Sequence, residues 1–171
     1  LWAIAPRFSS QKPTLLLNAH IDTVKPVSGW KKDPWKATLK GDCLYGLGSN
    51  DDGASLVTLL YAFIELSGKQ QPYNLVFLAS AEEEVSGKDG IESVLSLLPH
   101  IDVAIVGEPT CMQPAIAEKG LMVLDVTAHG TSGHAAREEG DNAIYHAMDD
   151  MQWFRTHKWP LVSNFLRTVK M

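Results

Sequence analysis

Three continuous apolar runs and two stretches with helical spacing alternate along the first 110 residues. The apolar runs are bounded by polar residues and are typical of buried strands: PTLLLNAHID (13–22), YNLVFLASA (73–81) and IDVAIVGEPT (101–110). Apolar residues recur at helical spacing in 54–69, and 90–100 predicts a second helix that ends near its proline. This order of strands and helices predicts a layered α/β domain with largely parallel strands.

The pattern changes after Gly120. Residues 121–130 alternate as in a half-exposed strand, 141–157 predict an amphipathic helix, and 165–171 begin another strand. We therefore expect a domain boundary at Gly120. The two expected domains are the N-terminal part of a larger domain, 1–119, and the start of a second domain, 120–171.

Composition narrows the class of protein. The 171 residues are 45% hydrophobic, which is enough for a sizeable core. The net charge is −5 and the basic residues form no run, which argues against a nucleic-acid surface. No window approaches the roughly 18 apolar residues of a membrane span, and the N-terminus lacks the order of a signal peptide, so we expect a cytoplasmic protein without membrane partners. Cys43 and Cys111 fit no metal-binding or redox spacing.

Polar side chains follow each of the three expected strands. His20, the acidic triplet 82–84 and Glu108 stand at these strand ends, and the long Gly-rich and Asp-rich loop 28–53 closes with GLGSNDDG. Carboxyl ends of parallel strands meet at one rim of a sheet, where ligands gather. One imidazole among several carboxylates suits Zn²⁺, Co²⁺ or Mn²⁺. Asp22, two residues after His20 and on the same face of the strand, could accept the second imidazole N–H.

Each of these motifs alone has an ordinary structural interpretation. HID can be a surface histidine with a turn aspartate, GLGSNDDG a tight turn, EEE a solvated charge run, and GEPT a turn. A phosphate-binding loop at GLGSNDDG is an alternative hypothesis. However, its two adjacent carboxylates and its lack of lysine would repel phosphate.

The order of the motifs HID, GLGSND, SAEEEVSG and VGEPT resembles the M20 metallopeptidases, the dizinc amidohydrolases. The resemblance implies a three-layer zinc-peptidase-like catalytic domain, incomplete here, followed by the start of an α+β ferredoxin-like lid and dimerisation domain. It implies His20 as terminal ligand of one zinc ion and Asp51 as the carboxylate that bridges both ions. Glu84 would bind one ion and Glu108 the other, with two Zn²⁺ per complete subunit and Co²⁺ as a possible substitute. A non-proline cis peptide is implied between Asp51 and Asp52.

The same resemblance assigns three catalytic residues. Glu83 matches the general base, which would activate a metal-bridged water, and Asp22 matches the residue that orients His20. AHGTSGHAA resembles the lid segment whose histidine, here His134, donates to the oxyanion in the partner subunit. The implied partners are therefore a small-molecule N-acyl amino acid and a second subunit that forms a homodimer through the lid domain.

The implied activity is zinc-dependent hydrolysis of the amide bond of an N-acyl amino acid. Within the family, the sequence of these motifs most resembles the acetylornithine deacetylase branch. Three departures stand beside it. Leu47 replaces the usual Arg, and DGAS follows Asp51 where Met-Lys-Gly-Gly is common. No residue matches the family's second terminal histidine ligand, so we expect the 171 residues alone to hold the second zinc poorly and to be inactive. The desuccinylase and dipeptidase branches, and a non-catalytic metal-binding or dimerisation fragment, remain alternatives.

Overall fold

The computed structural model describes residues 1–117 and 122–158. The chain divides into two compact units, Leu1–Gln113 and Pro114–Met171. The identity of these parts as a catalytic and a lid domain, with the boundary expected at Gly120, stays a prediction. Within the described part, no helix is long and apolar enough to cross a bilayer.

A four-stranded sheet forms the centre of the first unit, in the order β1-β5-β2-β6. β2 (Thr14–His20) pairs in parallel with β5 (Asn74–Ser80) on one side and with β6 (Val103–Val106) on the other. β1 (Trp2–Ile4) runs antiparallel along β5. The predicted α/β class with largely parallel strands is therefore confirmed, while the short edge strand β1 was not predicted.

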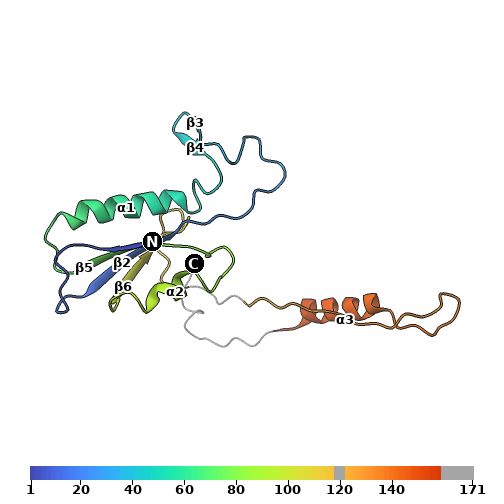
Figure 1. The fold of residues 1–171 in the computed structure, drawn as a ribbon. Coiled ribbons are helices and arrows are strands. Elements are labelled where there is room, and N and C mark those ends of the chain that lie inside the picture. Colours follow the sequence, from blue (N-terminus) through green and yellow to red (C-terminus); the bar gives the residue numbers. More distant parts are fainter. Residues whose placement is uncertain (118–121, 159–171) are drawn as a thin grey trace. The chain divides into compact units, whose positions relative to one another are not determined.

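Helices cover both faces of this sheet (Figure 1). α1 (Gly53–Ser67) packs on one face, where Phe63 contacts the buried cluster that contains Leu17 and Phe77. The opposite face, with Leu16 and its neighbours on β5, is packed by Val94, Leu98 and Ile101, in and after α2 (Ile91–Leu95). Because successive side chains of a strand point to opposite faces, the continuous apolar runs of β2 and β5 supply both cores at once.

The long loop between β2 and α1 contains a two-stranded hairpin. β3 (Thr38–Lys40) pairs antiparallel with β4 (Cys43–Tyr45), so the loop 28–53 is not wholly irregular. After this hairpin the chain turns back to the sheet and enters α1. The loop thus delivers GLGSNDDG to the carboxyl ends of the strands.

In the second unit, α3 (Ala143–Thr156) confirms the amphipathic helix predicted in 141–157. Asn142 caps its N-terminus by accepting a hydrogen bond from the N–H of Ile144 at 3.0 Å. The strand expected in 121–130 is absent from the described residues 122–130, because a strand exists only with a hydrogen-bonded neighbour and this segment has none there. The strand expected in 165–171 lies outside the described residues.

Candidate metal centre

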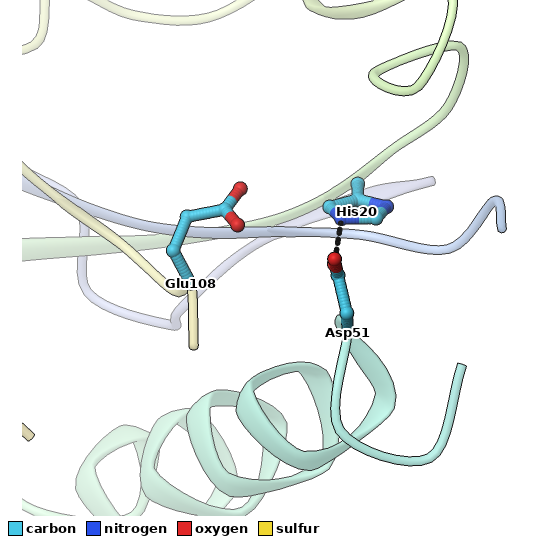
Figure 2. A group of neighbouring side chains, drawn as sticks. All are labelled: His20, Asp51 and Glu108. Atoms are coloured by element: carbon cyan, nitrogen blue, oxygen red, sulfur yellow. Dashed lines mark hydrogen bonds and ion pairs between the residues drawn. The ribbon is translucent and has the colours of Figure 1, made fainter. Parts of the chain in front are cut away.

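His20 ends β2 at the carboxyl edge of the sheet and is 2% exposed. Its Nε2 lies 3.0 Å from Oδ1 of Asp51, and a dashed line in Figure 2 marks this contact. Its Nδ1 lies 3.0 Å from the backbone carbonyl oxygen of Asp22. Both ring nitrogens are therefore engaged, and the orientation of the imidazole is fixed.

Asp51 reaches His20 from the turn that begins α1. Gly48 in this turn has φ +71°, a conformation that favours glycine. The N–H of Gly53 donates to the carbonyl of Gly48 at 2.8 Å, and a Cβ at Gly53 would lie 2.6 Å from that same oxygen. The peptide bond between Asp51 and Asp52 is cis, which confirms the expectation from the resemblance. The glycines of GLGSNDDG thus allow the close turn that presents Asp51.

His20, Asp51 and Glu108 form a group whose ligand atoms all lie within 4.8 Å of one another. In Figure 2 the carboxylates of Asp51 and Glu108 point toward the imidazole, Asp51 from the start of α1 and Glu108 from the segment after β6. Zinc binds nitrogen and oxygen at about 2.0–2.2 Å, so two ligands of one ion are at most about 4.4 Å apart. The observed spacing fits a single cation after a small side-chain adjustment.

A second group, His20, Glu83 and Glu84, satisfies the same 4.8 Å criterion. Its two glutamates follow β5, and their backbone is held by Asp22. The carboxylate of Asp22 accepts the N–H of Glu83 at 3.3 Å and that of Glu84 at 3.2 Å. Every first-unit residue expected to bind metal is therefore brought to one rim of the sheet, and Glu83 joins them.

The position of Asp22 differs in one detail from the expectation. Its carboxylate oxygen lies 3.5 Å from Nδ1 of His20, while its backbone carbonyl makes the shorter contact. The carboxylate is instead occupied by the two N–H groups of the acidic triplet. The side chain of Asp22 therefore positions Glu83 and Glu84, and its main chain orients His20.

Three groups of the site have shifted pKa values. Burial opposes protonation of His20, but hydrogen bonds with Asp51 and Asp22 outweigh it and raise the pKa of His20. Burial, followed by the negative charges of Asp52 and Glu83, raises the pKa of Glu108. Burial also disfavours ionised Asp22, yet the N–H groups of Glu84 and Glu83 outweigh it and lower the pKa of Asp22.

The carboxylates of the site have little positive charge to balance them. Among the described residues, no ion pair joins a lysine or arginine to the site carboxylates Asp51, Asp52, Glu83, Glu84 and Glu108. One imidazole with several carboxylates is a hard N/O donor set of the kind that binds divalent cations. Both the spacing and the charge of these residues therefore fit a bound cation.

Two acidic residues have contacts that sequence reasoning did not anticipate. Asp52 is 1% exposed and accepts the backbone N–H of His20 at 3.2 Å. Glu82 accepts the N–H of Asp89 at 3.1 Å, and its carbonyl accepts that of Gly87 at 2.9 Å, so it closes the loop after β5. The only sequence signal for Asp52 was its departure from the common Met at that position.

His134 lies in the second unit, in the exposed loop before α3. Its Nδ1 accepts the N–H of Ala136 at 3.1 Å, and its carbonyl accepts that of Arg137 at 2.9 Å. These local bonds shape the loop and leave Nε2 without a hydrogen bond among the described residues. The proposed role of His134 in a partner subunit stays a prediction.

Comparisons with known proteins show which sequences this chain is similar to. The sequence model of the peptidase family M20/M25/M40 matches residues 16–158. Acetylornithine deacetylase of Proteus mirabilis is 37% identical over 132 residues, 76% of this chain and 34% of the relative. The protein of the same name from Pectobacterium carotovorum is 36% identical over 142 residues, 81% of this chain and 37% of the relative.

Two further similarities extend the comparison. Succinyl-diaminopimelate desuccinylase of Wigglesworthia glossinidia brevipalpis is 32% identical over 148 residues, 78% of this chain and 39% of the relative. The crystal structure of human carnosine dipeptidase 1 aligns with a TM-score of 0.44 and 23% identity over 58% of this chain and 23% of that one. The chain thus spans between a third and two fifths of the length of the curated relatives named here.

Proposed function

Because the chain belongs to the peptidase family M20/M25/M40, we propose that it contributes the N-terminal part of a dizinc active site that hydrolyses the amide bond of an N-acyl amino acid. The similarity to acetylornithine deacetylases supports this substrate class. The observation that carries the proposal is the convergence of His20, Asp51 and Glu108 within 4.8 Å of one another. These residues come from three separate segments and meet at the rim where ligands of parallel sheets gather.

In this proposal His20, Asp51 and Glu108 would hold one zinc ion, and Asp51 and Glu84 would hold a second. Asp51 suits the bridge because a carboxylate has two oxygens, each able to serve one cation. Bound zinc supplies Lewis-acid polarisation of the amide carbonyl and makes water a stronger acid near neutral pH. Cobalt is the natural spectroscopic substitute.

Glu83 acts as the general base of the proposed reaction. It is exposed and stands within 4.8 Å of His20, so its carboxylate is open to water at the edge of the site. There it takes a proton from the attacking water and returns it to the nitrogen of the leaving amine. Asp22 keeps Glu83 in place through the backbone N–H of that residue.

His134 would donate a hydrogen bond to the developing oxyanion in a partner subunit, which requires a homodimer formed through the second unit. A cytoplasmic location and a small-molecule substrate complete the proposal. Its local support is the Gly-rich loop that exposes His134 before α3.

A second substrate is supported by the similarity to a succinyl-diaminopimelate desuccinylase. The two candidates differ in the acyl group that is removed, and the metal site described above serves either. Both are therefore assayed together.

The first experiment measures zinc by plasma emission on the chain after chelator treatment and reconstitution. We expect at least one zinc ion per chain, and a smaller content would refute the metal centre. The second assays hydrolysis of N-acetylornithine and N-succinyl-diaminopimelate by the natural protein that contains these residues.

The variant for this assay is Glu83→Gln, with Glu92→Gln, a change at an exposed residue of α2, as matched control. Glu83→Gln should lower kcat by about 10²–10⁴-fold with zinc content unchanged. Full activity of Glu83→Gln would refute the base assignment. Bound zinc without turnover of either substrate would favour a non-catalytic metal-binding role.

A further inference from the structure

Asp52 connects two segments that carry expected metal ligands. It follows Asp51 directly at the start of α1, and its Oδ2 accepts the backbone N–H of His20, at the end of β2, at 3.2 Å. The residue is 1% exposed, so this bond is shielded from water. Through it, the backbone positions of His20 and Asp51 are tied together.

Helix capping does not explain this side chain. Asp52 occupies the N-cap position of α1, where an aspartate commonly accepts an N–H of the first turn through its side chain. Here the side chain makes no capping hydrogen bond, although the backbone carbonyl of Asp52 accepts the N–H of Leu56 as the first bond of the helix. The carboxylate is turned away from its own helix toward the strand that carries His20.

The second oxygen of the same carboxylate is unsatisfied. Oδ1 of Asp52 is buried and has no hydrogen-bond partner among the described residues. No lysine or arginine of the described part forms an ion pair with Asp52. A buried carboxylate with one oxygen unbonded and no basic side chain paired to it is unfavourable, and a nearby cation offsets that cost.

We propose that Asp52 is a positioning residue of the metal centre. One oxygen fixes the backbone of His20 relative to Asp51, and the charge of the carboxylate favours the cation-loaded state over the metal-free state. The inference rests on the proposed function, because it needs a cation held by His20, Asp51 and Glu108. It assigns a role to Asp52, which stands where the common motif has Met.

The test titrates Co²⁺ into the metal-free chain and its variants Asp52→Asn and Asp52→Ala, with Asp42→Asn as an exposed control. Asp52→Asn retains an oxygen that accepts the N–H of His20 but removes the charge. It should keep the wild-type Co²⁺ absorption bands, bind Co²⁺ several-fold more weakly and raise the melting temperature of the metal-free chain. Asp52→Ala removes the acceptor as well, so its bands should change and its affinity should fall about 10–100-fold.

Wild-type bands and affinity in Asp52→Ala would overturn the proposal, as would altered bands in Asp52→Asn. Wild-type affinity in Asp52→Asn would overturn the role of the charge. If Asp52→Ala does not fold, the absorption bands and the Co²⁺ affinity of Asp52→Asn still test the proposal. The proposed function itself would be refuted if the wild-type chain bound no Co²⁺. If the wild-type chain binds Co²⁺ and both variants behave identically to it, only the role of Asp52 is refuted.

Discussion

Replacing Asp22 by alanine should lower the free energy of unfolding of the metal-free chain by about 2 kcal/mol. The Asp22 carboxylate accepts two backbone N–H groups, from Glu83 at 3.3 Å and from Glu84 at 3.2 Å. A hydrogen bond to a charged group contributes about 1.5–3 kcal/mol. Both bonds are long and the Asp22 side chain is 26% exposed, so we take about 1 kcal/mol for each.

The effect should depend on pH with a definite sign. The pKa of folded Asp22 is lowered below its unfolded value of about 3.9, because the N–H groups of Glu84 and Glu83 outweigh the opposing effect of burial. Stability from such a group is present in full above the unfolded pKa and is lost as the pH falls through the folded pKa. The difference between wild type and Asp22→Ala should therefore stay constant from about pH 7 to pH 5 and shrink below about pH 3.9.

Urea denaturation followed by circular dichroism, with EDTA present throughout, measures both effects. Asp42→Ala, a change at an exposed aspartate of the β3–β4 turn, is the matched control and should leave the unfolding free energy within about 0.5 kcal/mol of wild type. Equal stability of Asp22→Ala and wild type at pH 7 would refute the reasoning. It would mean that the bonds to Glu83 and Glu84 do not hold the loop after β5 in solution.

Three further predictions concern the metal centre and the core. The pKa values of His20 and Glu108 are raised, so protons compete with a cation for these groups at higher pH than is usual for them. Co²⁺ affinity should therefore fall from pH 7 to pH 5, measured by calorimetry in buffers of different ionisation enthalpy, and pH-independent affinity would contradict this. Gly53→Ala should destabilise the chain by about 1–3 kcal/mol in urea melts, because its Cβ would lie 2.6 Å from a backbone oxygen; an unchanged midpoint would show that the turn adapts freely. Phe63→Ala should cost about 3–5 kcal/mol by the same assay, since Phe63 joins α1 to the sheet core, and a loss below 1 kcal/mol would contradict that packing.

The main elements of the first unit were predictable because they are long and strongly patterned. β2 and β5 are continuous apolar runs that end in polar residues, and α1 has helical spacing over four turns. β1 escaped prediction because its three residues are stabilised by pairing with β5, far away in the sequence. Residues 122–130 form no strand within the described part of the chain, for the related reason that an alternating pattern cannot supply a neighbouring strand.

The sequence by itself determined the α/β class, the residue types of the candidate centre and their order along the chain. Parallel strands with polar ends were sufficient to predict that His20 and Glu108 meet at one rim. Only the tertiary structure decided how these groups are bonded: the Asp22 carboxylate binds the N–H groups of Glu83 and Glu84, and buried Asp52 binds the N–H of His20. The physical reason is that periodicity reports which side of an element is apolar, whereas a hydrogen bond depends on the register and turns that bring distant residues within about 3 Å.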